Sequence, residues 1–197
     1  AAMNLGKTQR VTELVEACLP LARQAGDRWL TAMALNNLAE VTLQRGDLQS
    51  AEEMFSEGFA LLSELNAKGF MAILLTGLGV LAQARQDYQQ ALAMHTRSIR
   101  LACEVDDRRV LAMSLEKTAE VLAKIGQPNR AAQILGAADA LRSQLNTPVE
   151  QIDFLDYEKI LTFMRETLGE NQFRADWEIG RKMTLDEAIA LTPDATQ

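Results

Sequence analysis

The sequence repeats with a period of 40 residues, and this repeat constrains the fold more than any single residue does. Leu38, Leu78 and Thr118 align at this spacing, and many other positions then fall into register. The best-matched sets are Ala51, Ala91 and Ala131, and Leu61, Leu101 and Leu141. A fixed period of this size is typical of a stacked array of one supersecondary unit.

Each unit contains two stretches of helical periodicity separated by a polar break. In the middle unit Leu74, Leu78 and Leu81 follow the spacing of one amphipathic helix, and a second apolar stretch follows Gln86 and Asp87. Each unit is therefore predicted to be a helical hairpin. The predicted helices span residues 28–44 and 48–65, 69–85 and 88–104, and 109–125 and 129–145.

The array is predicted to begin in the middle of a repeat. The register places a turn at Gly6 and Lys7, followed by a second helix from Val11 to Gln24 with no first helix to pair with. Pro20 lies inside this helix, where it removes one backbone hydrogen bond, and it predicts a kink or an early end. A repeat buries its apolar face only against its neighbours, so we interpret the chain as the C-terminal piece of a larger protein.

The repeat pattern stops near Asn146, and a different helical region is predicted to follow. Residues 147–150 (Thr-Pro-Val-Glu) and 184–187 (Thr-Leu-Asp-Glu) have the capping-box pattern of a helix start. We expect this region to cover the last repeat as a helical cap. The predicted fold is an all-α, right-handed superhelix of hairpins in one domain. Its parts are a half repeat (1–26), three repeats (27–66, 67–106 and 107–146) and the cap (147–197).

Leu78-Gly79, Tyr88, and Ala51 followed by Phe55 resemble the tetratricopeptide repeat, whose usual period is about 34 residues. Longer repeats of this kind look like those of bacterial signal-transduction ATPases of the MalT and LuxR-type regulator class. The C-terminal end is similar to the closing segment of such proteins. It carries this likeness at residues 130–142, 157–158, 168–170, 173, 177–181 and 185–189.

This resemblance implies a regulatory sensor or scaffold and transfers no catalytic residue. It implies an ATPase domain upstream of the repeats and a DNA-binding, cyclase or kinase domain attached at either end. We therefore expect partner domains in the full-length protein.

Charge and hydropathy restrict the partners of the chain. The net charge of −7 argues against direct binding to nucleic acid, because that affinity comes largely from Lys and Arg. No apolar run approaches the roughly 20 residues of a membrane span, and the N-terminus lacks a secretory signal, so we expect a cytoplasmic protein. Cys18 and Cys103 are expected to be small buried side chains, with a disulfide left open as the alternative.

No catalytic, metal or cofactor site is predicted. Gly6-Lys7-Thr8 lacks the earlier glycine of a phosphate-binding loop, and Gly77 and Gly79 lie in mid-helix as packing residues. His95 is the only histidine and takes the register position of Phe55 and Leu135, which indicates a packing role. One histidine and two distant cysteines do not make a usual zinc site. An enzyme would require a deep pocket joining His95 to acidic residues.

Two surfaces remain as candidate binding sites. Phe173 and Trp177 could form an aromatic ligand site, but their spacing favours a hydrophobic anchor for a cap helix. The concave face lined by the first helix of each hairpin is the predicted site for a protein or regulatory ligand. The alternative function is self-association, with a homodimer formed through the open N-terminal face. Nine residues on the first helices are predicted to be free of packing and available for binding: Asn36, Asn37, Glu40, Thr76, Gln83, Glu116, Lys117, Glu120 and Lys124.

Overall fold

In the computed structural model, residues 2–145 and 151–193 are described, with side chains described for 10–145 and 157–193. These residues form α-helices and no strand. The helices are α1 (Ala2–Ala25), α2 (Arg28–Gln44), α3 (Leu48–Glu64), α4 (Lys68–Ala84), α5 (Tyr88–Glu104), α6 (Arg108–Lys124), α7 (Pro128–Leu145), α8 (Gln151–Leu168), α9 (Glu170–Lys182) and α10 (Leu185–Ala190).

The turns between the first seven helices share one geometry that recurs every 20 residues. Each turn has one residue with positive φ, and it is glycine in three turns and a polar residue in the other three. The next residue is often aspartate; Asp47, for example, accepts a hydrogen bond from the backbone of Ser50 and starts α3. The turns within and between hairpins therefore look alike. The positive-φ residues are Gly26, Gly46, Asn66, Gln86, Asp106 and Gly126.

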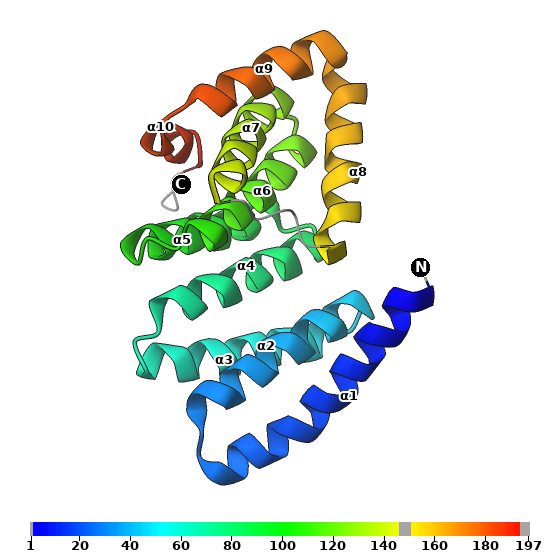
Figure 1. The fold of residues 1–197 in the computed structure, drawn as a ribbon, viewed down its shortest axis with the longest axis vertical. Coiled ribbons are helices and arrows are strands. Elements are labelled where there is room, and N and C mark those ends of the chain that lie inside the picture. The colour runs from blue at the N-terminus through cyan, green and yellow to red at the C-terminus, as the bar shows by residue number, and fades with distance from the viewer. Residues whose placement is uncertain (1, 146–150, 194–197) are drawn as a thin grey trace.

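The hairpins α2–α3, α4–α5 and α6–α7 stack in chain order (Figure 1). Each first helix also contacts the first helix of the next hairpin, so that α2, α4 and α6 lie side by side. The predicted superhelix of hairpins is confirmed. Helices α2 and α5 have the bounds expected from the sequence, and α4 and α6 start one residue earlier than expected.

Glycines allow α4 to approach the second helices closely. A Cβ atom on Gly77 would lie 2.5 Å from the ring of Phe55, and one on Gly79 would lie 2.2 Å from the ring of His95. Phe55 and His95 are fully buried. The glycines are therefore packing residues as predicted, and His95 occupies the packing position that the register assigned to it.

Helices α8, α9 and α10 form the predicted C-terminal cap. In Figure 1, α8 runs along the right side of the array and α9 crosses its top. Phe173 on α9 is buried in the same core cluster as Leu135 and Met164, and its ring lies 5.4 Å from that of Trp177. The hydrophobic-anchor interpretation of this aromatic pair is therefore supported. The capping box at Thr184 and Glu187 is present, whereas the one expected at 147–150 lies outside the described residues.

The contact between α7 and α9 combines backbone proximity with partly buried amide hydrogen bonds. Asp176 on α9 accepts from the side-chain amides of Asn129, Gln133 and Gln172 at 2.8–2.9 Å. Burial alone would raise the pKa of Asp176, but these amide donors outweigh it and the pKa is lowered. The carboxylate therefore stays charged where α9 rests on the last repeat.

The turn expected at Gly6 and the burial expected for the cysteines are wrong, and the expectation at Pro20 is wrong in part. Helix α1 begins at Ala2, so Gly6 and Lys7 are helical rather than in a turn. Of the kink or early end predicted at Pro20, the early end does not occur, because helix α1 continues through Pro20 to Ala25. Cys18 is only half-buried and Cys103 is exposed, and both are free thiols.

Candidate functional site

The structure divides the nine predicted binding residues into a polar chain, a buried ion pair, a partly exposed end and one buried hydroxyl. Thr76 is the clearest departure from the expectation that all nine are free of packing. Its hydroxyl lies 3.0 Å from that of Ser98 and 3.1 Å from that of Ser114, in a buried contact that joins α4, α5 and α6. The hydroxyl of Thr76 is thus used in the contact between hairpins.

The polar chain crosses from α5 through α4 to α6. Lys124 donates to the Oε1 atom of Gln83 at 3.2 Å and to Glu120 at 2.8 Å, while Lys117 lies 3.7 Å from Glu120. Lysine can only donate, so the amide nitrogen of Gln83 faces Nε2 of His95, 3.3 Å away. Four of the nine predicted residues therefore form one connected cluster with His95 beneath it.

Glu116 belongs to a buried ion pair rather than to an open surface. Its carboxylate accepts hydrogen bonds from the Nε and one Nη group of Arg142 on α7, so the two side chains form a bidentate ion pair. Tyr157 and Ile160 of α8 line a small pocket together with Glu116 and Lys117. Burial, followed by the charges of Asp139 and Glu116, raises the pKa of the Tyr157 phenol, so this group stays neutral. Helix α8 therefore lies against this part of α6.

The predicted binding residues are more exposed at α2. Asn37 and Glu40 are exposed, and the side-chain nitrogen of Asn36 donates to Glu40 at 3.0 Å. Asn36 itself is buried, and its Oδ1 atom has no hydrogen-bond partner among the described residues. This end therefore combines exposed polar groups with a buried acceptor.

The sequence interpretation missed Arg142 and Tyr157 as partners of the predicted site. Arg142 could have been noticed, because its register position holds Ala22, Leu62 and Ala102 in the other units. A charged residue at an apolar register position signals a buried partner. Tyr157 lies beyond the repeat, where no register applies.

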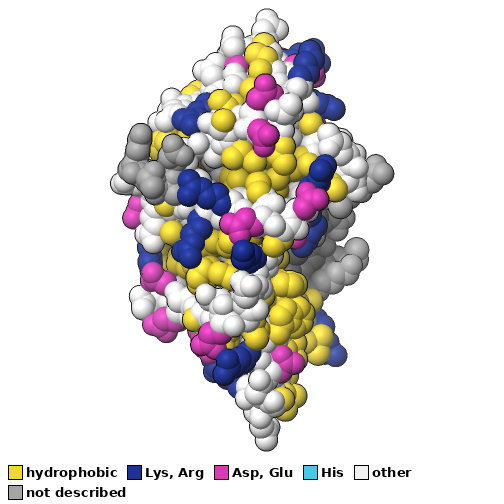
Figure 2. Space-filling model, turned by 90° about the vertical axis from the view of Figure 1, so that its left-hand side faces the viewer, with side chains coloured by type: hydrophobic (Ala, Val, Ile, Leu, Met, Phe, Trp, Pro, Cys, Tyr) yellow, Lys and Arg dark blue, Asp and Glu magenta, His cyan; other side chains and the backbone are white. Residues whose placement is uncertain are grey.

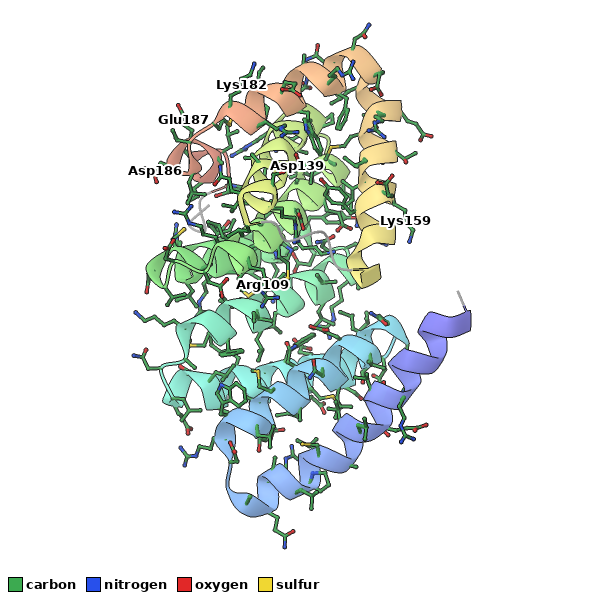
Figure 3. All side chains as sticks on the ribbon, viewed as in Figure 1. Arg109, Asp139, Lys159, Lys182, Asp186 and Glu187 are labelled. Carbon is green, nitrogen blue, oxygen red and sulfur yellow. The ribbon has the colours of Figure 1, made fainter. Side chains whose placement is uncertain are left out.

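Asp139 and Lys159 are charged residues outside this cluster. In Figure 3, Asp139 lies on α7 between the cap helices, and Lys159 points away from α8. Asp139 pairs with Arg181 of α9 at 3.2 Å. Within the described residues, no group of His, Cys, Asp and Glu is arranged to hold a metal ion. None of the described helices combines the length and apolar character that crossing a bilayer requires.

His95 predicts a pH dependence of stability. Its complete burial, followed by the positive charge of Lys117, lowers its pKa from 6.5 to about 3. The unfolded chain takes up a proton below pH 6.5 while the folded chain does not, so acidification favours unfolding. We expect the free energy of unfolding to fall by about 2 kcal/mol between pH 7 and pH 5. Urea denaturation at several pH values measures this loss.

The matched control is His95→Leu, which places the residue of the third unit, Leu135, at this position. The chain has one histidine, so the variant should lose most of the pH slope above pH 5, whatever its absolute stability. An unchanged slope in His95→Leu would contradict the assignment.

Comparison with known proteins agrees with a fold of stacked helical hairpins. The tetratricopeptide-repeat family model matches residues 31–66, which hold most of α2 and all of α3. The chain is also 26% identical over 193 residues to proteins of Mycobacterium bovis and of two strains of Mycobacterium tuberculosis. These proteins are named provisionally as HTH-type transcriptional regulators. The alignment covers 96% of this chain, which spans about a fifth (21%) of the length of each relative.

Proposed function

We propose that this tetratricopeptide-like array is a non-catalytic binding scaffold within a larger transcriptional regulator, and that its concave face binds a partner protein. The polar chain on α4 and α6 is the observation that carries this proposal. Lys117 and Lys124 each hold more donors than their contacts with Glu120 and Gln83 require. They can therefore donate to carboxylate or carbonyl groups of a bound segment.

The regulatory part of the proposal is supported by the names of the relatives and by the similarity of the closing segment to regulators of the MalT and LuxR-type class. We assign DNA binding and ATP hydrolysis to other domains of the full-length protein. The surface of this chain is consistent with DNA binding by another domain, because acidic and basic side chains are interspersed in Figure 2. Such a surface presents no extended basic patch for a phosphate backbone on the face that is drawn.

The partner segment is expected to lie along α2 and α4 and to end at the lysines of α6. Tyr157 and Ile160 line a small pocket together with Lys117, so α8 limits the segment on that side. At α2, Asn37 and Glu40 are exposed and offer both hydrogen-bond donors and acceptors. A small regulatory ligand at the same groups is the second form that this binding could take.

Charge reversal tests the site. Peptides selected from a random library on the purified chain are expected to bind the double variant Lys117→Glu/Lys124→Glu at least about tenfold more weakly, which corresponds to about 1.4 kcal/mol. The matched control is Arg174→Glu/Lys182→Glu, which makes the same charge change at exposed positions of α9. Binding curves from fluorescence anisotropy measure both. Equal losses in the two variants would indicate a net-charge effect and contradict a concave-face site.

A further inference from the structure

Helix α1 carries an apolar face that the described structure leaves uncovered. Val11, Leu14 and Leu21 have exposed fractions of 55%, 59% and 64%, and half-buried Cys18 lies between them. At spacings of three and four residues these side chains lie in one stripe. Thr12 and Ala22 are buried on the same helix, which packs on α2.

The 40-residue register shows what covers this stripe elsewhere. The residues equivalent to Val11 are Ala51, Ala91 and Ala131, all with 0% exposure. Each of these lies on a second helix that packs on the first helix of its own hairpin. Val11 holds the same position on a second helix that has no described first helix.

The position of Cys18 identifies the contact most directly. Its equivalent Gly58 lies beside the carbonyl oxygen of Ala32 on α2, 3.4 Å from where a Cβ atom would stand. Its next equivalent, Ser98, donates to the carbonyl oxygen of Ala72 on α4 at 2.6 Å. Ala32 and Ala72 are themselves one period apart, so the same contact recurs between the first and second helix of two hairpins.

The first helices show what kind of helix fits this face. All three carry a buried pattern of a small residue, a leucine three positions later and a small residue four positions after that. The small residues let the two helix backbones approach closely, and the leucine fills the space between them. The three sets are Ala32, Leu35 and Ala39; Ala72, Leu75 and Gly79; and Ala112, Leu115 and Ala119.

From this register we infer that the exposed face of α1 is the docking site for one further amphipathic helix with the pattern Ala-x-x-Leu-x-x-x-Ala/Gly, contributed by polypeptide outside these 197 residues. This helix completes a fourth hairpin with α1. The length of the relatives supports this occupant, because the chain spans only about a fifth of each. The inference is independent of binding on the concave face.

A fusion protein tests the docking site. A copy of residues 28–47, which hold α2 and its following turn, is joined directly to Thr8, the register equivalent of Leu48. We expect hydrogen exchange at the backbone amides of Val11, Leu14 and Leu21 to slow at least about tenfold relative to the unfused chain. The control fusion carries Leu35→Asp in the added copy only, and its amides should exchange as in the unfused chain. Equal exchange in the fusion and the unfused chain would overturn the inference.

Sedimentation equilibrium of the 197-residue chain distinguishes the other occupant, a second copy. A monomer at high micromolar concentration supports a helix from other polypeptide. A dimer that Leu14→Lys dissociates would show that a second copy covers the stripe, and it would overturn the inference.

Discussion

Gly180→Ala is expected to detach α9 from the last repeat and to lower the free energy of unfolding by about 3 kcal/mol or more. A Cβ atom at Gly180 would lie 1.8 Å from the carbonyl oxygen of Gln133 on α7. The contact is reciprocal, because a Cβ atom at Gly136 would lie 2.2 Å from the carbonyl oxygen of Trp177. Both obstacles are backbone atoms, which a change of rotamer cannot move. The two helices must therefore separate.

Separation of α9 would also break the hydrogen bonds of Asp176 and expose Phe173 and Trp177. Urea denaturation followed by tryptophan fluorescence reports both effects, since Trp177 lies in this contact and Trp29 lies at the other end of the array. The emission of Trp177 is expected to shift to longer wavelength in Gly180→Ala before the repeats unfold.

Gly69→Ala is the matched control for this substitution. Gly69 is also helical, but its added Cβ atom would meet the side chain of Val105 at an ordinary 3.7 Å. Alanine is the better helix former, so this variant should be unchanged or more stable by up to about 1 kcal/mol. If Gly180→Ala and Gly69→Ala unfold at the same urea concentration, the close helix contact does not govern the stability of the cap.

The hairpin array could be predicted from the sequence because its determinants are local and repeated. Turn residues such as Gly46 and Asp47 recur with the period, so an ambiguous stretch in one unit can be interpreted from the aligned stretches of the other units. The half repeat lacked this support. Gly6 shares the register position of the turn residue Gly46, but it is helical in α1, so the register alone did not decide its conformation.

The candidate site was harder to predict, because the register does not show which side of a first helix faces the next hairpin. Asn36, Thr76 and Glu116 share one register position and are all polar, which is typical of a solvent-facing position. In the structure all three are buried, and Thr76 and Glu116 each bond a different partner on a neighbouring helix. The shared polarity therefore indicated that this position makes polar contacts. It did not show whether those contacts are with water or with a neighbouring helix, because that depends on the packing.

The same register shows how a buried charge was accommodated in the third unit. Glu116 and Arg142 stand where the second unit has Thr76 and Ala102, and their side chains are only 8% and 11% exposed. A charged pair has thus taken the place of a small polar and an apolar residue at the centre of the last hairpin. Its two-pronged geometry offsets part of the cost of removing both charges from water.

Arg142→Ala is expected to lower the free energy of unfolding by about 3–5 kcal/mol, because the carboxylate of Glu116 loses its guanidinium in a buried position. The double variant Glu116→Thr/Arg142→Ala copies the second unit and should recover most of this loss. A threonine at 116 can donate to the carbonyl oxygen four residues earlier, as Thr76 does to Ala72 at 3.2 Å. Urea denaturation of both single variants and the double variant measures the coupling. A double variant that costs the sum of the two single variants would show that the pair is not coupled, and that the loss in Arg142→Ala comes from packing of the arginine stem against its neighbours.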